Sequence, residues 1–238
     1  MTRLTALKIK IFADGADKAG MLEMAKNPLI KGFTTNPTLM RKAGIQDYKA
    51  FAQDVLLNIP NLPVSLEVFS DEFVEMERQA RLIASWGPNV YVKIPVTNTR
   101  GASSGLLIQK LSSEGIKLNV TALTHLRQVS AVAAYLDDVT PAYISVFAGR
   151  VADTGVDAFA VMREAKYLVK FKPNIEIIWA SPRELYNIFQ ADAAGVDIIT
   201  VSNDILKKLP LIGKDLDEYS LDTVKMFYED GKKAGFML

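Results

Sequence analysis

The sequence lacks cysteine altogether and has a single histidine, His125, among its 238 residues. The absence of cysteine excludes disulfides, thiolate nucleophiles and iron–sulfur ligation, and it is typical of proteins in a reducing compartment such as the cytoplasm. One histidine excludes a zinc site of three histidines, or any metal site with two histidine ligands, within one chain. Acid–base and nucleophilic chemistry must therefore depend on Lys, Asp, Glu, Ser, Thr, Tyr or Arg.

Excess charge and long apolar runs are missing as well. The chain has 28 Lys and Arg against 27 Asp and Glu, which gives a formal net charge of +1 and predicts no strong attraction to nucleic acid or anionic membranes. Its first residues lack the apolar core of a signal peptide, and no later stretch approaches the ~20 apolar residues of a membrane span. We expect a globular cytoplasmic protein without nucleic-acid or membrane partners.

Short β-branched or apolar segments alternate with segments of helical periodicity along the chain. The expected strands are Leu7–Ala13, Gly32–Thr35, Val64–Phe69, Val90–Pro95, Lys117–Thr121, Tyr143–Phe147, Glu176–Ala180 and Ile198–Val201. The expected helices are Asp17–Lys26, a region opened by Asn36-Pro37, Asp71–Trp86, Gly105–Ser113, Thr124–Leu136, Val156–Val169, Pro182–Ala194 and Asn203–Leu209. Strands separated by helices run parallel, because each crossover returns the chain to the same edge of the sheet.

Eight strand–helix units in a chain of this length predict an α/β fold, a single (β/α)₈ TIM barrel over residues 1–238. An open doubly wound sheet is the structural alternative. Beyond the eighth unit, residues 220–235 are expected to form an extra helix with Leu221, Val224, Phe227 and Tyr228 on one face. Such a face predicts that the helix covers a barrel end or packs on a neighbouring subunit.

Lys93 is the most informative single residue, because it lies in the middle of the apolar segment Val90–Pro95. A charged side chain in a buried strand must be paired, neutral or directed into a polar lumen. Desolvation favours the neutral amine, which can attack a carbonyl and form a Schiff base. The alternative is a structural lysine that forms an ion pair or extends to solvent from the strand end.

Two carboxylates are expected near this lysine. Asp14 follows the first strand and Glu67 lies near the end of the third, so in a barrel both would point towards Lys93 from the carboxyl-terminal mouth. A Schiff-base reaction moves protons, and without a usable histidine a carboxylate is the expected carrier. The alternative is that both carboxylates only neutralise the lysine.

Other polar side chains occupy the same ends of the strands. Thr34 and Asn36 could bind sugar hydroxyls or cap the following helix. Three further polar groups lie in apolar strands: Asn119, Thr121 and Ser145. Arg150, Ser181 and Arg183 follow the sixth and seventh strands, where barrel enzymes often bind phosphate; a surface salt bridge is the alternative for each arginine.

Five motifs in this order resemble the transaldolases, particularly the short group that contains fructose-6-phosphate aldolase. They are Gly32-Phe33-Thr34-Thr35-Asn36-Pro37, Val92-Lys93-Ile94-Pro95-Val96-Thr97, Asn119-Val120-Thr121, Ile144-Ser145-Val146-Phe147-Ala148-Gly149-Arg150 and Ala180-Ser181. The resemblance covers nearly the whole chain. It implies a TIM barrel, sugar-phosphate substrates, no metal or organic cofactor, and a homo-oligomer, often a pentamer or decamer.

The resemblance also implies a class I aldol mechanism, with roles assigned by position. Lys93 matches the Schiff-base lysine, and Asp14 matches the carboxylate that moves a proton at the cleaved C3–C4 bond. Glu67 and Thr121 match the pair that positions a water. The remaining positions match residues that bind the substrate. Thr34, Asn36, Asn119 and Ser145 match residues around its dihydroxyacetone part, and Arg150, Ser181 and Arg183 match residues that bind its phosphate.

Two positions distinguish the members of this group. In this comparison the aldolase resembles this chain but has Gln in place of Glu67 and Tyr in place of Phe147, so both residues here favour a transaldolase. Such an enzyme moves a dihydroxyacetone unit from a ketose phosphate, fructose 6-phosphate or sedoheptulose 7-phosphate, to an aldose phosphate. An aldolase that releases free dihydroxyacetone is the alternative, and a non-catalytic phosphosugar-binding barrel is the second. Pro182 and Val146 depart from the family pattern and concern mainly the phosphate side.

Overall fold

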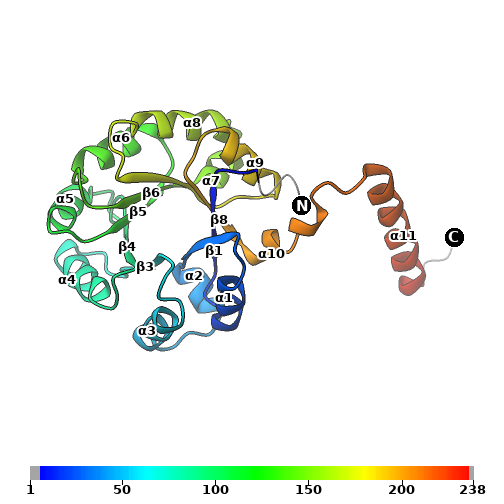
Figure 1. Ribbon diagram of the computed structural model, residues 1–238, viewed down its shortest axis with the longest axis horizontal. Helices are drawn as coiled ribbons and strands as arrows, with labels where there is room; N and C mark the ends of the chain where they lie inside the picture. The colour runs from blue at the N-terminus through cyan, green and yellow to red at the C-terminus, as the bar shows by residue number, and fades with distance from the viewer. Residues whose placement is uncertain (1–5, 236–238) are drawn as a thin grey trace.

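Within residues 6–235, which the computed structural model describes, eight parallel strands close into one barrel in chain order, from β1 beside β2 round to β8 beside β1 (Figure 1). The closed order confirms the TIM barrel and rejects the open sheet. The strands are β1 (Lys10–Asp14), β2 (Ile30–Thr34), β3 (Val64–Glu67), β4 (Val90–Pro95), β5 (Leu118–Leu123), β6 (Ala142–Val146), β7 (Ile175–Trp179) and β8 (Ile198–Ser202).

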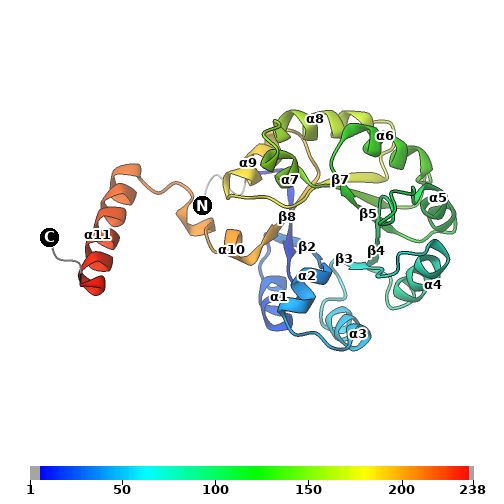
Figure 2. The ribbon, with the colours of Figure 1, turned by 180° about the vertical axis from the view of Figure 1, so that it is seen from behind.

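Helices surround the barrel, as Figure 2 shows from behind. They are α1 (Lys18–Ala25), α2 (Pro37–Lys42), α3 (Tyr48–Asn58), α4 (Phe73–Ala84), α5 (Gly105–Ser113), α6 (Leu126–Tyr135), α7 (Ala148–Asp153), α8 (Ala158–Leu168), α9 (Tyr186–Ala193), α10 (Asn203–Leu206), the 3₁₀ turn η1 (Leu209–Leu211) and α11 (Leu216–Ala234). The apolar faces of the helices that precede α11 pack on the outer face of the strands in one continuous core.

The element boundaries differ from the sequence expectation where side chains bind the backbone. The first strand begins at Lys10 and not at Leu7, because the amides of Lys8 and Ile9 donate to the carboxylate of Asp192. The last helix begins at Leu216, four residues before the expected start, because the Asp215 side chain accepts from the first free amides and caps it.

The short helix α7 was not expected, since residues 148–153 precede the predicted helix Val156–Val169. It brings Gly149 against the loop after β7. A Cβ atom at Gly149 would lie 1.6 Å from the carbonyl oxygen of Ser181. Only glycine permits this close approach of α7 to the loop that carries Ser181.

The barrel interior is a second, smaller core. The rings of Phe12 in β1 and Tyr143 in β6 lie 5.7 Å apart, and those of Tyr91 in β4 and Tyr143 stack at 3.9 Å. Because these strands are not neighbours, the side chains can meet only inside the barrel. Side chains two positions apart in a strand point to the same face of the sheet. Asp14, two residues after Phe12, and Lys93, two residues after Tyr91, therefore also point inwards, nearer the carboxyl-terminal mouth of the barrel.

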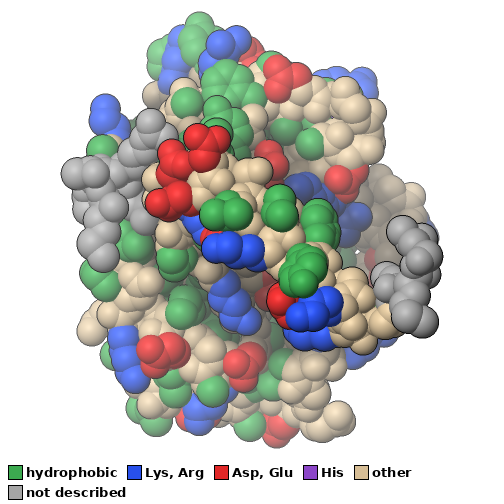
Figure 3. Space-filling model, turned by 90° about the vertical axis from the view of Figure 1, so that its right-hand side faces the viewer, with side chains coloured by type: hydrophobic (Ala, Val, Ile, Leu, Met, Phe, Trp, Pro, Cys, Tyr) green, Lys and Arg blue, Asp and Glu red, His purple; other side chains and the backbone are tan. Residues whose placement is uncertain are grey.

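The helix α11 projects away from the barrel (Figure 1) and has no buried residue among those described. Its predicted apolar face is exposed, and hydrophobic side chains lie among charged ones on this side of the molecule (Figure 3). Among residues 6–235 no helix has the length and apolarity to cross a membrane.

Candidate active site

The amine of Lys93 lies inside the barrel, and only 6% of the residue is exposed. Its Nζ is 3.0 Å from Oε2 of Glu67 and donates to the carbonyl oxygen of Thr35 at 2.8 Å. Glu67 pairs with Lys93 in register between β3 and β4, so the two strands themselves set this contact. The ion pair of the structural alternative is therefore present, and so is the buried amine that a Schiff base needs.

Asp14 ends β1 on the same side of the interior. Its Oδ1 accepts from the Thr34 hydroxyl at 2.7 Å, and its Oδ2 accepts from Nδ2 of Asn36 at 3.4 Å. Burial raises the pKa of the Asp14 carboxyl, while the charge of Lys93 and the two donors lower it; the negative charge of Glu67 also raises it, and the net shift is upwards. A raised pKa makes the ionised carboxylate a stronger base than an exposed aspartate.

Of the two functions that the sequence left open for Asn36, the structure shows the helix cap. Its Oδ1 accepts from the amide of Leu39 and caps α2, while its Nδ2 points to Asp14. The cap fixes which end of the amide faces the site. The Asp17 side chain caps α1 in the same way, and His125 caps α6 in a capping box with Gln128.

A line of hydrogen bonds joins side chains of β6, β5 and β3 inside the barrel, beside Lys93, which is in register with Asn119. Oγ of Ser145 donates to Oδ1 of Asn119 at 2.7 Å, and Nδ2 of Asn119 donates to Oγ of Ser65 at 3.0 Å. In β5 the hydroxyl of Thr121 is buried and has no hydrogen-bond partner among the described residues. A buried polar group without a partner is suited to hold a water or a substrate atom.

The three predicted phosphate-binding residues lie at the ends of β6 and β7, and the structure connects them through α7. Ser181 has a left-handed backbone, φ 60°, and contacts the helix at Gly149. The guanidinium of Arg150 lies 5.8 Å from the centre of the Phe147 ring, which packs on the interior aromatic cluster. Arg183 instead forms an ion pair with Asp153 at the end of α7, where both side chains are half exposed.

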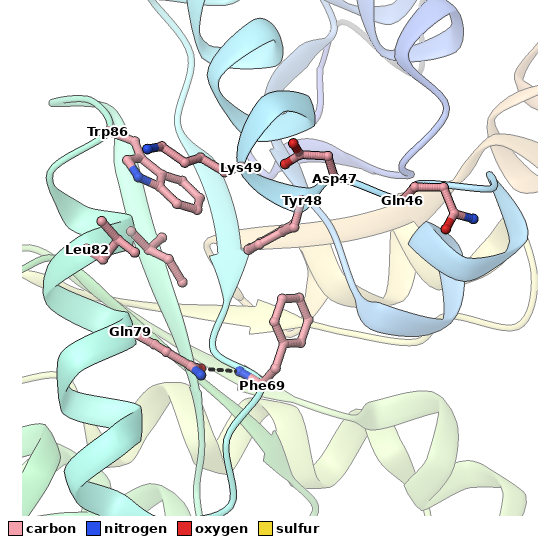
Figure 4. A pocket seen from close by; sticks show the side chains of 9 residues that line it. Gln46, Asp47, Tyr48, Lys49, Phe69, Gln79, Leu82 and Trp86 are labelled. Carbon is pink, nitrogen blue, oxygen red and sulfur yellow. Dashed lines mark hydrogen bonds between the residues drawn. The ribbon is translucent and has the colours of Figure 1, made fainter.

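A hollow of about 440 Å³ lies outside the barrel, between α3 and α4 (Figure 4). Tyr48 lines it, and its phenol donates to the backbone oxygen of Glu67 at 3.2 Å. Burial raises the pKa of the Tyr48 phenol, which therefore keeps its proton. Gln79 on α4 accepts from the amide of Phe69, as the dashed line shows, so two side chains hold the chain directly after β3.

Sequence reasoning missed Ser65, Thr200 and Tyr48. Ser65 lies two residues before Glu67, and Thr200 is the polar residue within the apolar segment Ile198–Val201, so alternation along each strand could have found both. Nothing in the local sequence could have connected Tyr48 to Glu67.

No group of three or more His, Asp or Glu side chains in the described part of the chain is placed to hold a metal ion.

Solved structures of low sequence identity share the fold. A 2,3-dimethylmalate lyase of the PEP mutase/isocitrate lyase superfamily aligns over 98% of this chain and 86% of its own, with a TM-score of 0.56 and 12% identity. The citrate synthase SbnG aligns over 96% and 98%, with a TM-score of 0.59 and 14% identity. At these identities the likeness concerns the barrel alone.

Sequence relatives are more specific. A probable transaldolase of Dehalococcoides mccartyi is 34% identical over 221 residues, which cover 90% of this chain and 97% of the relative. Probable transaldolase 2 of Listeria monocytogenes is 32% identical over 228 residues, which cover 94% and 100%. The family model described as transaldolase/fructose-6-phosphate aldolase matches residues 11–238. The chain therefore belongs to the transaldolase/fructose-6-phosphate aldolase family.

Proposed function

We propose that this protein is a class I transaldolase that transfers a dihydroxyacetone unit from a ketose phosphate, fructose 6-phosphate or sedoheptulose 7-phosphate, to an aldose phosphate. The observation that carries the proposal is the amine of Lys93, buried in the barrel beside Glu67 and under the mouth where Asp14 lies. Relatives named probable transaldolase support the same reaction type.

In the first step Lys93 attacks the C2 carbonyl of the donor. The carbinolamine must lose its hydroxyl as water, so a proton has to reach that oxygen. Glu67 is 3.0 Å from the amine, and the unpartnered hydroxyl of Thr121 supports a water between substrate and carboxylate. The iminium that results is the electron sink for the next step, and this chemistry requires neither a metal nor an organic cofactor.

In the second step Asp14 takes the proton of the C4 hydroxyl. The C3–C4 bond breaks, its electron pair moves into the iminium to give an enamine on Lys93, and the aldehyde fragment leaves. The raised pKa of Asp14 suits a base that must hold the proton until the acceptor arrives. The enamine carbon then attacks the acceptor aldehyde, Asp14 returns the proton to the new hydroxyl, and water releases the product from Lys93.

The remaining predicted residues would bind the substrate. Asn36, Asn119 and Ser145 present amide and hydroxyl groups to the dihydroxyacetone part, with Thr34 beside them. Arg150, Ser181 and Arg183 would bind the phosphate at the mouth. For Arg183 this requires that a phosphate compete with Asp153, which is feasible because an exposed ion pair contributes little.

Phe147 favours transfer over release of free dihydroxyacetone. It packs beside the interior aromatic cluster and offers no proton to the enamine, which would wait for an aldehyde. The aldolase reaction is the second candidate, and turnover of fructose 6-phosphate without an acceptor would favour it. A non-catalytic phosphosugar-binding barrel is the third, favoured by the Lys93–Glu67 ion pair alone.

Reductive trapping tests the proposal. The protein is mixed with fructose 6-phosphate and borohydride, which reduces a Schiff base to a stable amine, and is analysed by intact and peptide mass spectrometry. We expect a dihydroxyacetone-sized adduct confined to Lys93 and absent from Lys93→Met. A protein that stays unmodified where a known transaldolase is labelled would refute the assignment.

We also propose a homo-oligomer, cytoplasmic as expected from the sequence, in which α11 packs on a neighbouring copy. The helix projects from its own barrel and exposes Leu221, Val224, Phe227 and Tyr228. Light scattering on the intact protein should give several copies, a pentamer or decamer by the family resemblance. Val224→Lys with Phe227→Lys should reduce the mass towards a monomer, whereas Lys225→Ala should leave it unchanged; a monomeric unaltered protein would contradict the proposal.

A further inference from the structure

Thr200 is a buried threonine of β8 that has no part in the mechanism above. Only 6% of the residue is exposed, and its hydroxyl contacts the hydroxyl of Thr34, of which 4% is exposed. Thr34 in turn donates to Oδ1 of Asp14 at 2.7 Å. Three side chains from three neighbouring strands thus form one line that ends on the proposed base.

The direction of these bonds follows from the number of protons. A threonine hydroxyl has one proton and two lone pairs. The proton of Thr34 is used towards Asp14, so in its contact with Thr200 the Thr34 oxygen accepts and the Thr200 hydroxyl donates. In such a chain each bond polarises the next, and Thr34 becomes a stronger donor to the carboxylate.

The barrel explains why two threonines meet here. β1 lies between β2 and β8, with Asp14 in register with Thr34 on one side and Phe12 in register with Thr200 on the other. The Phe12 ring occupies the space inside Gly32, where a Cβ atom would lie 2.6 Å from it. Both threonines are β-branched and therefore have few side-chain rotamers, so a bond between them holds both in place.

The two oxygens of Asp14 are held unequally. Oδ1 accepts the short bond from Thr34, whereas Oδ2 accepts a bond of 3.4 Å from Asn36. The more weakly held oxygen is the one free to approach a substrate hydroxyl. We propose that Thr200 is a positioning residue: it orients the Thr34 hydroxyl, which fixes Oδ1 of Asp14 and presents Oδ2 to the C4 hydroxyl of the donor.

This inference rests on the proposed transaldolase reaction and predicts a defined defect. Thr200→Val keeps the shape and removes the donor, so Thr34 can turn away and Asp14 loses its short bond. We expect donor cleavage to slow by roughly 3- to 10-fold, the equivalent of one net hydrogen bond, with little change in KM. The charges facing Asp14 are those of Lys93 and Glu67, which the substitution leaves unchanged. Weakening the Thr34 bond removes stabilisation from the ionised Asp14 carboxylate. The acid limb of the pH profile, where the rate falls as Asp14 is protonated, should therefore move to higher pH.

The experiment is the single-turnover release of glyceraldehyde 3-phosphate from fructose 6-phosphate by the intact protein, measured from acid to neutral pH. Thr200→Val is compared with Thr200→Ser, which restores the hydroxyl and should restore most of the rate and the position of the limb. Thr140→Val is the matched control, because its hydroxyl bonds the carbonyl oxygen of Ser112, outside the site, and its rate should equal that of the unaltered protein. Thr200→Ala replaces Thr200→Val if the valine variant does not fold.

Three results would overturn the inference: an unchanged rate in Thr200→Val, a slower rate with the acid limb unmoved, or no rescue by Thr200→Ser. The second would indicate a merely structural role. Failure of the proposed function is distinguishable, since the unaltered protein would then neither release the aldehyde nor form the borohydride adduct.

Discussion

The two ends of the barrel interior are built by the same strands with different kinds of residue. At the amino-terminal end Phe12, Tyr91 and Tyr143 pack ring against ring, and Lys10 and Glu176 form an ion pair nearby. Two positions further along the same strands, the inward residues are Asp14, Lys93 and Ser145. One end is an aromatic core, and the other is a set of hydrogen-bonded and charged groups.

The electrostatics of the two ends differ in the same way. Burial raises the pKa values of Tyr91 and Tyr143, so both phenols keep their protons at neutral pH. Burial also raises the pKa of Asp14, but Lys93 and two hydrogen-bond donors oppose the shift. The aromatic amino-terminal end therefore supplies packing, while the carboxyl-terminal end places opposing charges next to each other, where a substrate can meet them.

We expect the strongest change at Asp14, in the carboxyl-terminal end of the barrel interior. Asp14→Asn should lower turnover by roughly 10²- to 10⁴-fold, because the C4 proton has no acceptor. The fold should persist, since Lys93 keeps Glu67 as partner and Thr34 can still donate to the amide oxygen. Steady-state kinetics with urea unfolding in parallel checks this, and borohydride should still trap an uncleaved donor on Lys93. Activity within a few-fold of the unaltered protein would remove Asp14 from the mechanism.

The next effect concerns the aromatic core at the amino-terminal end of the barrel interior. Phe12→Ala should lower the free energy of unfolding by about 3–5 kcal/mol, because it opens a cavity in the interior core. Phe171→Ala is the matched control: that side chain is 83% exposed, and its removal should change stability by less than about 0.5 kcal/mol. Equal losses for the two variants in urea unfolding would show that the aromatic end does not stabilise the barrel.

A pH profile sharpens the contrast. Asp14 must be ionised to accept a proton, and burial raises its pKa above the ordinary 3.8, so the acid limb of donor cleavage should lie above pH 3.8. The measurement is the single-turnover rate against pH. A limb at or below 3.8 would argue that Asp14 is freely hydrated.

The same shift has a consequence for stability. With its native pKa raised, the carboxyl favours the folded state below pH 3.8, and this contribution is lost as the pH rises through the native pKa. Asp14→Asn does not titrate. Its stability relative to the unaltered protein should therefore increase with pH across this interval in urea unfolding, and a constant difference would contradict the sign of the shift.

The weakest change is expected at Phe147, which directly follows β6. Phe147→Tyr should raise the release of free dihydroxyacetone from fructose 6-phosphate by a few-fold, because a phenol can hold a proton or water near the enamine. Assays with and without an aldose phosphate acceptor measure this partition. Phe189→Tyr, on α9, offers an aromatic control outside the barrel interior and should leave the ratio unchanged.

Much of the fold followed from the sequence. Apolar strands alternating with amphipathic helices predicted the barrel, since such a chain has few other ways to bury both faces of its strands. The placement of Lys93, Asp14 and Glu67 on one side of the interior also followed, from period-two alternation and parallel strands. Two features could not be predicted, because they depend on residues distant in the chain. The start of β1 depends on hydrogen bonds to Asp192, and α7 depends on the approach of Gly149 to Ser181.

The alternation of strands and helices, the lysine within an apolar strand and the family motifs can be recognised in the chain alone, because they depend on local periodicity and on short motifs. The folded structure adds what the motifs do not predict: Thr200 donates to Thr34, Tyr48 supports Glu67, Arg183 pairs with Asp153, and α11 leaves the barrel. These contacts join residues distant in the chain. Barrel closure and helix packing bring them together, and no local pattern encodes those distances.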